Sequence, residues 1–241
     1  METTSFVALA KQQAIHLRTM NIANNIANAS TPGYRKNEMN FAAWVSRQTT
    51  TSPIIYSIEH PSRVNLEAGA FTVTDNQLDL AIDANERAFF VVQARAEGRP
   101  LLTRSGIFRL DESGRIVTPS GDTLLGTNDQ PIVLPGIDTK ITVSQSGEIL
   151  EGDVTVGQIK ILEVPPGSSL ESRGRSLFQP NATRPPGSYS IRQGVVEGSN
   201  VQVVTEMTSL MEITRQYEML QQLLTEEHTR LNDLIDKLPV I

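Results

Sequence analysis

Three aspartates in one short stretch are the residues of this sequence best spaced for acid–base chemistry. Asp75, Asp79 and Asp83 recur four residues apart in "TDNQLDLAID". Two carboxyl groups can act as acid and base in hydrolysis when a fold brings them together. Here they alternate with leucine and isoleucine, which predicts strand residues whose acidic side chains face outward. We therefore expect no catalytic carboxylate pair.

The other residue types that could do chemistry are few. The chain has no cysteine and three histidines, His16, His60 and His228, none in metal-ligand spacing with a second ligand. Neither a Gly-x-Ser-x-Gly elbow nor a phosphate-binding loop occurs. The sequence therefore predicts a protein that is not an enzyme, with no catalytic residue, no bound metal and no cofactor.

The amino-acid composition excludes further classes of protein. With 241 residues and 39% hydrophobic content, the chain can build a core. Its formal net charge of −6 argues against nucleic-acid binding, which favours a basic surface. No apolar stretch approaches the ~20 residues of a membrane span, so we expect no membrane insertion. No basic leader precedes an apolar run, so we also expect export, if any, without a cleaved signal peptide.

Among the elements that would position these residues, the C-terminal 45 residues are the clearest. Apolar or aromatic residues recur every seven positions, with Met207 in the alternate heptad slot. The row consists of Val203, Leu210, Tyr217, Leu224, Leu231 and Leu238. This spacing predicts a long helix that packs lengthwise on other helices as a coiled coil. A second row, with Ile213 and Leu220, makes the apolar face too wide for one partner.

The N-terminal helix ends in a run of asparagines. They are Asn21, Asn24, Asn25 and Asn28. Each costs roughly 0.5–0.7 kcal/mol relative to alanine in a helix interior. A buried amide left unpaired costs about 1–3 kcal/mol, so a row of amides can penalise wrong alignment between neighbouring helices. With Ile22 and Ile26, we expect them to form an assembly interface; the alternative is that they face water near a frayed helix end.

A turn stops this helix firmly. Pro32 forces Thr31 out of helical geometry, and Gly33 can adopt the positive φ of a helix exit. We therefore predict a helix-stop turn at Thr31, Pro32 and Gly33.

Between the two helices the pattern changes to β. Residues 89–94 read as a strand, and residues 107–118 read as a hairpin around a Ser-Gly turn. The prolines in residues 165–192 predict an irregular connection. We expect five segments: an assembly helix and turn (1–35), a mixed connecting segment (36–84), a β domain (85–180), a linker (181–194) and a heptad helix (195–241). The expected fold class is α+β, with long N- and C-terminal helices forming an α-helical coiled-coil assembly region and a central all-β domain inserted between them.

Both chain ends resemble the bacterial flagellar axial proteins, the rod and hook subunits. "NNIANASTPGYRK" (24–36) is similar to their N-terminal motif, and "EGSNVQVVTEMTSLMEITRQYEM" (197–219) to their C-terminal motif. "FFVVQ" (89–93) and "LTRSGIFRLDESGRIVTPSGDTLLG" (102–126) resemble their β domain. The compact length is most like the proximal rod protein, with the distal rod protein as the alternative. One departure is "NERA" at 85–88, where the family usually has glycines.

The resemblance implies a structural subunit of the flagellar basal body. Such a subunit would polymerise through its terminal helices into the periplasmic drive-shaft for motility, and it would contact copies of itself and other rod subunits. It would be exported unfolded by the flagellar type III apparatus. The alternatives from other classes are a periplasmic wall-acting enzyme, and an export chaperone or adhesin-like binding module that stays monomeric or forms small closed oligomers.

Overall fold

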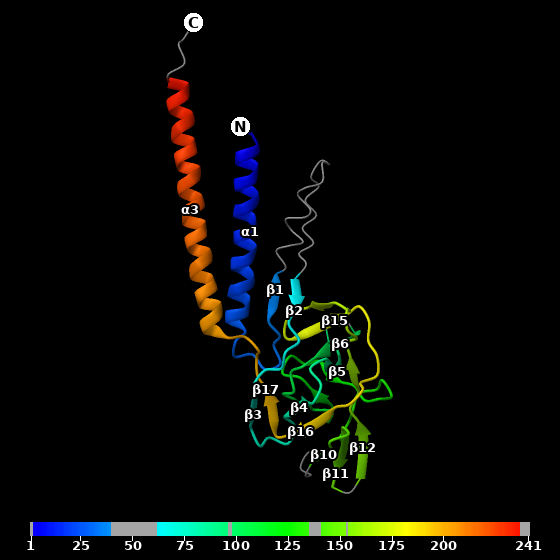
Figure 1. Ribbon diagram of the computed structural model, residues 1–241. Coiled ribbons are helices and arrows are strands. Elements are labelled where there is room, and N and C mark those ends of the chain that lie inside the picture. Colours follow the sequence, from blue (N-terminus) through cyan, green and yellow to red (C-terminus); the bar gives the residue numbers. More distant parts are fainter. Residues whose placement is uncertain (1, 40–61, 96–97, 135–140, 153, 237–241) are drawn as a thin grey trace. The chain divides into compact units, whose positions relative to one another are not determined.

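The computed structural model describes residues 2–39, 62–95, 98–134, 141–152 and 154–236 (Figure 1). The chain divides into two compact units. The first, here called the helical unit, combines Met1–Ala27 with Gln202–Ile241. The second, here called the body, is Asn28–Val201.

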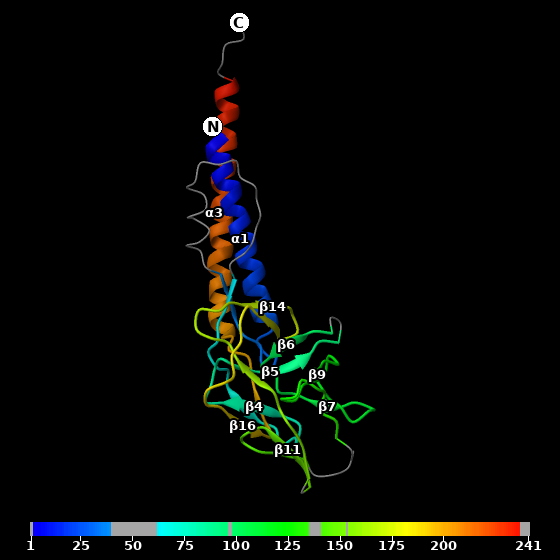
Figure 2. The ribbon, with the colours of Figure 1, turned by 90° about the vertical axis from the view of Figure 1, so that its right-hand side faces the viewer.

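The helical unit is a pair of antiparallel helices, α1 (Glu2–Ala27) and α3 (Val203–Asp236), which lie side by side in Figures 1 and 2. Ile15 and Ile22 of α1 are buried against Ile213 and Leu220 of α3. Burying an aliphatic side chain of this size stabilises by about 1.5–3 kcal/mol, so these four residues hold the pair together.

The expected fold class is wrong. In the part of the chain that the structure describes, one helix lies at each end and the centre is mostly β, and the helices do not form the expected coiled-coil region. Along the predicted seam, Val203, Met207 and Tyr217 remain 37%, 48% and 39% exposed. The row with Ile213 and Leu220 packs on α1 instead. One helix can cover only one stripe of another, and the heptad pattern did not say which of the two rows α1 would cover.

The body is built of short strands. They are β1 (Asn37–Met39), β2 (Ser62–Val64), β3 (Phe71–Val73), β4 (Leu80–Asp83), β5 (Ala88–Gln93), β6 (Pro100–Thr103), β7 (Arg109–Leu110), β8 (Ile116–Val117), β9 (Thr123–Leu124), β10 (Ile141–Val143), β11 (Glu148–Glu151), β12 (Val154–Gln158), β13 (Ile161–Glu163), β14 (Leu170–Ser172), β15 (Leu177–Pro180), β16 (Ser190–Gln193) and β17 (Val195–Glu197). The largest sheet has the order β14-β15-β6-β5-β9-β8-β7, and β13 also pairs with β5. A second sheet has the order β10-β11-β12, and three further pairs are β1-β2, β16-β4 and β17-β3.

Strand β5 is the centre of the body because both of its faces are buried. Phe90 and Val92 point into one core cluster, while Phe89 and Val91 point into another. This is the alternation that a strand imposes on successive side chains. Edge-to-face ring contacts with Phe108 and Phe178 extend the two clusters, with ring centroids 5.5 Å and 5.8 Å apart.

The last strands of the body pair with early ones. In β16, Ile191 pairs with Ile82 of β4, and in β17 Val196 pairs with Thr72 of β3. The expected irregular connection over residues 165–192 is therefore wrong, since β14, β15 and β16 lie within it. The prolines misled the prediction: Pro180 stands at the end of β15, a strand position that tolerates the missing N–H.

Candidate functional site

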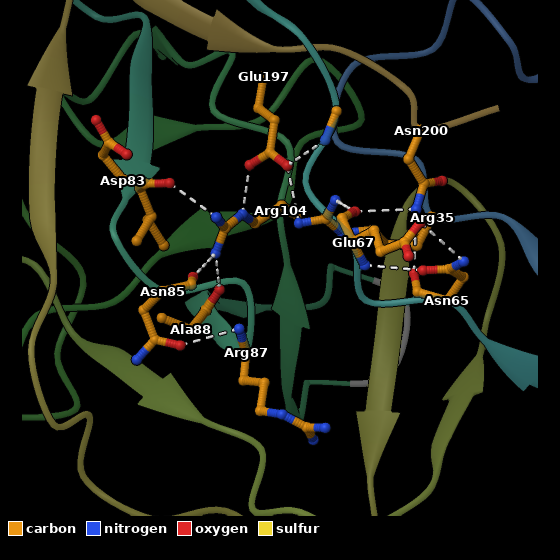
Figure 3. A network of polar contacts seen from close by, with 12 residues as sticks. Arg35, Asn65, Glu67, Asp83, Asn85, Arg87, Ala88, Arg104, Glu197 and Asn200 are labelled. Atoms are coloured by element: carbon orange, nitrogen blue, oxygen red, sulfur yellow. Dashed lines mark hydrogen bonds and ion pairs between the residues drawn. The ribbon is translucent and has the colours of Figure 1, made fainter. Parts of the chain in front are cut away.

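A buried cluster of charges joins the segment after α1 to the segment before α3 (Figure 3). Glu197, the last residue of β17, receives guanidinium groups on both of its oxygens. Arg35 Nη2 lies 2.8 Å from Oε1, and Arg104 Nε lies 2.5 Å from Oε2. The Gly69 N–H donates a third bond to Oε1, at 3.0 Å. The three charged side chains are at most 1% exposed, and we call Arg35, Arg104 and Glu197 the closure node.

Arg104 is held on every side by fixed acceptors. Its Nη1 donates to the carbonyls of Asn85, at 2.9 Å, and Ala88, and its Nη2 donates to the carbonyl of Ile82, at 2.7 Å. These carbonyls belong to β4, β5 and the turn between them, so one side chain ties both strands and their connection to Glu197. Charge-assisted bonds of this kind are about twice as strong as neutral ones, which makes Arg104 the anchor of the node.

Arg35 is less well satisfied. Its Nη1 donates to the carbonyl of Glu67, but its Nε and Nη2 make no hydrogen bond among the described residues, and Nη2 contacts Glu197 as an ion pair. Burial lowers the pKa of Arg35 from its usual value to about 10, opposed by the nearby Glu197 carboxylate and reinforced by the Arg104 charge. Arg35 is still protonated at neutral pH. The node therefore holds two cations against one carboxylate.

Asn200 extends the closure node along the backbone. Its Oδ1 accepts from the N–H of Lys36 at 2.7 Å, and its Nδ2 donates to the carbonyls of Asn65, at 3.2 Å, and Glu67, at 3.0 Å (Figure 3). The amide thus bonds to two chain segments at once, as a strand would. Residues 33–36 and 197–200 are fixed side by side within the body.

The predicted helix-stop turn lies in the body, next to the node. Gly33 has φ +67°, and its N–H donates to the carbonyl of Glu197 at 2.8 Å. A Cβ on Gly33 would lie 2.1 Å from the backbone nitrogen of Ser105, so no side chain fits there. Thr31 donates its N–H to the carbonyl of Asn28 at 3.1 Å, and Pro32 accepts from the hydroxyl of Ser176 at 3.4 Å.

The predicted asparagines occupy different environments. Asn25 is 1% exposed, and its Nδ2 donates to Glu206 Oε2 at 3.2 Å, within the helical unit. Asn24 is exposed, while Asn21 and Asn28 are half-buried. Asn25 therefore joins α1 to the first turn of α3 in the same chain, where the acidic Glu206 also complements the helix dipole.

The predicted apolar interface residues divide into two groups. Ile22 is buried in the contact between α1 and α3, with the partly buried Ile26, Leu210 and Leu224 beside it. The exposed group consists of Val203, Met207 and Tyr217. Leu231 lies in α3, and Leu238 lies outside the described residues.

One of the three aspartates contradicts the sequence analysis. Asp79, expected to face outward, is only 6% exposed and accepts bonds from Thr74 Oγ1 at 2.6 Å and Asn76 Nδ2 at 3.2 Å. Asp75 is exposed and Asp83 is half-buried. The three do not gather as a catalytic set.

The node residues themselves were missed by the sequence analysis. Arg35 and Glu197 lie in "GYRK" and "EGSN", inside the two terminal motifs, but those motifs were assigned to contacts between subunits. The ion pair spans 162 positions of sequence, and a residue pattern carries no sign of such a contact. The available sequence signal for this ion pair was an arginine and a glutamate close to the glycines that flank the two helices.

Among the described ranges, no three histidine or acidic side chains are grouped so that they could hold a metal ion. Neither of the helices in the described part is both long enough and apolar enough to span a bilayer.

The fold and the closure node define a class of protein in which a β body is closed by both of its flanking segments and a helix continues from each. Three family descriptions match this chain in order. "Flagella basal body rod protein" matches residues 8–35, "Flagellar hook protein FlgE/F/G D1 domain" residues 81–151, and "Flagellar basal body rod FlgEFG protein C-terminal" residues 192–236.

Curated relatives match over most of their length. The flagellar basal-body rod protein FlgF of Rhizobium meliloti is 31% identical over 99% of this chain and 98% of its own. FlgF of Caulobacter vibrioides is 30% identical over 93% of both, and FlgG of the same organism 31% over 90% of both. The chain therefore belongs to the family of flagellar basal-body rod proteins. The predictions of a structural rod subunit most like FlgF and of a basal-body location are confirmed.

Proposed function

We propose that this rod subunit is of the proximal type and polymerises through the exposed faces of its terminal helices, with its own copies and with other rod and hook proteins. The observation that carries this proposal is the apolar surface of α3. Val204, Met211, Met219 and Leu223 are 79%, 63%, 64% and 48% exposed. On a soluble monomer, an apolar surface of this kind marks an interaction site.

The apolar residues do not lie on the stripe that packs on α1. Ile213 and Leu220 already bury that stripe, so a neighbour would cover other faces of α3. Met20 adds an exposed apolar side chain on α1, at 57%. Methionine adapts its shape to different partners, which suits a subunit that contacts both its own copies and other proteins.

The asparagine row has a divided role in this proposal. Asn25 donates a hydrogen bond to Glu206 of the same chain, so it helps to align α1 with α3. Asn24 is exposed and lies on a different face of α1, where a neighbouring helix could meet it. The register role is therefore assigned to Asn24 between subunits and to Asn25 within one.

The route to the rod is part of the same proposal. A periplasmic rod subunit of this kind would pass through the flagellar type III export apparatus. Isolated helices are marginal without packing partners, which suits helices that are completed only in the assembly.

The test replaces apolar side chains of α3 by polar ones. We expect a Met211→Gln, Leu223→Gln variant to fold as a monomer and to fail in rod assembly when it replaces the native protein. Losing two buried side chains weakens each subunit contact by about 3–6 kcal/mol, or roughly 10²–10⁴-fold in affinity. Rod yield in isolated basal bodies and swimming on soft agar are the two measurements.

The matched control is Glu212→Ala with Gln222→Ala, which changes the adjacent exposed polar residues and keeps good helix formers. We expect the control to retain rods and motility. Normal rod yield with the glutamine variant would refute assembly through α3. Equal loss in both variants would show that any change in this helix is harmful and would remove the specific role of the apolar surface.

A further inference from the structure

The segment 190–201 closes the body at several places at once. It contains β16 and β17, which pair with β4 and β3. It also contains Glu197, the carboxylate that pairs with both arginines of the closure node. Its Asn200 bonds to residues 36, 65 and 67.

The same segment fills the core. Ile191 is 2% exposed and belongs to the cluster that holds Phe90 and Val92 of the central strand. Val195 and Val196 are each 5% exposed. Without this segment, the central core would lose Ile191, and the buried Arg35 and Arg104 would lose the carboxylate that both of them pair with. Net stability of a domain is a small difference between large terms, so a loss of this extent removes it.

We propose that residues 190–201 are a closing segment on which folding of the whole body depends. Residues 28–189 have no stable fold without it, and the body gains its structure in one step when the segment pairs with β3, β4 and the two arginines. The closing segment is therefore no local addition to a finished sheet.

The position of the closing segment gives this dependence a consequence. A chain is made from its N-terminus, and a domain usually folds once its own residues are available. Here only α3 and the last residues follow the segment in sequence, so the body cannot fold until nearly all of the chain exists. An incomplete chain stays unfolded, which is the state that export through a narrow channel requires. This consequence for export depends on the proposed function, whereas the folding dependence does not.

Native-state hydrogen exchange on the full chain tests the proposal. The probes are the amides of Val91 in β5, bonded to the carbonyl of Lys160 at 3.2 Å, and of Ile191 in β16, bonded to the carbonyl of Gln145 at 3.0 Å. If the body opens as one unit, both amides exchange with the same protection factor, within about threefold. In Glu197→Gln both protection factors should fall together, by roughly 10²–10⁴-fold, since removal of one partner leaves buried charges uncompensated.

Asp129→Asn is the control, because it breaks an ion pair with Lys160 that is largely exposed on the aspartate side. We expect less than about fivefold change at either amide. If Ile191 exchanged much faster than Val91 in the wild type, the closing segment would open on its own and the proposal would fail. The wild-type comparison decides this even if Glu197→Gln does not fold. Because the readout is confined to the body, its failure would leave assembly through α3 untouched.

Discussion

Replacing Glu197 by glutamine should be one of the most damaging single changes to the body, although the two side chains have nearly the same shape. The carboxylate bonds to two guanidinium groups and one backbone N–H, and its side chain is 1% exposed. Neutralising it leaves Arg35 and Arg104 buried and charged. Removing one partner of a buried ion pair destabilises by about 3–5 kcal/mol. For a unit of this size, that corresponds to a fall in Tm of roughly 6–20 °C.

The same network predicts a mild effect at Arg35. Its pKa falls from the usual value to about 10 because burial penalises its charged form. At 1.36 kcal/mol per pKa unit, the charged state is disfavoured in the folded protein by roughly 3 kcal/mol at neutral pH. Arg35→Met removes the free-energy cost of this buried charge and keeps most of the buried aliphatic part of the side chain. The carbonyl of Glu67 retains its bond from Asn200. We expect a change in stability of less than about 1 kcal/mol.

Arg104 should behave like Glu197. Arg104→Met deletes the bonds to the carbonyls of Ile82, Asn85 and Ala88 together with the ion pair. Unpaired buried carbonyls cost about 1–3 kcal/mol each, although relaxation will reduce the sum. We therefore expect Arg104→Met to destabilise the body about as much as Glu197→Gln does. Both should destabilise it far more than Arg35→Met.

Urea unfolding followed by circular dichroism measures these differences. The double variant Arg35→Met, Glu197→Gln should be more stable than Glu197→Gln alone, because only one uncompensated cation remains. Such coupling between contacting residues typically amounts to 0.5–3 kcal/mol. The reasoning is refuted if Arg35→Met destabilises as much as Glu197→Gln, since the charge imbalance would then not govern the node.

Two further predictions concern the body. Glu163 accepts hydrogen bonds from the N–H of Gly187, at 3.0 Å, and from Arg184, and these bonds lower its pKa below the ordinary value. The stabilisation that Glu163 contributes is therefore complete above the ordinary carboxyl pKa of ~4.3. It is lost as pH falls through the lower pKa of the folded state. Glu163→Gln should therefore flatten the fall of the urea midpoint below about pH 4, and an unchanged acid slope would contradict the assignment. Gly33→Ala should destabilise by at least about 2 kcal/mol, through a left-handed φ and a clash with Ser105. Gly98→Ala, with φ +66° and nothing within 4 Å of the added Cβ, isolates the first effect and should cost about 1 kcal/mol; equal losses in thermal melts would exclude the clash.

Local sequence patterns predicted the elements whose geometry is decided by residues that are neighbours in sequence. The strand expected at residues 89–94 lies within one residue of β5, Ala88–Gln93. The proline and glycine after Thr31 ended a helix that the structure closes at Ala27. In both places, the residues that decide the geometry are neighbours in sequence, so the chain could be interpreted without its fold.

Long-range pairings could not be inferred in the same way. The bond between Asn25 and Glu206 spans 181 positions, and the ion pair of Arg35 with Glu197 spans 162. Polar residues in exposed-looking motifs gave no sign that they would be buried against each other. The wide apolar face of α3 posed the complementary problem, since it showed that more than one stripe was available but not that Ile213 and Leu220 would be covered first.

A single cysteine in α3 offers the most direct measurement of whether this surface is covered in the rod. The chain has no cysteine of its own, so Met211→Cys introduces one thiol at a side chain that is 63% exposed. Maleimide labelling of the purified subunit and of intact basal bodies is then compared, with urea-unfolded protein as the fully labelled standard. We predict fast labelling in the free subunit and protection of the thiol in the assembled rod. Equal labelling in both states would contradict assembly through this helix.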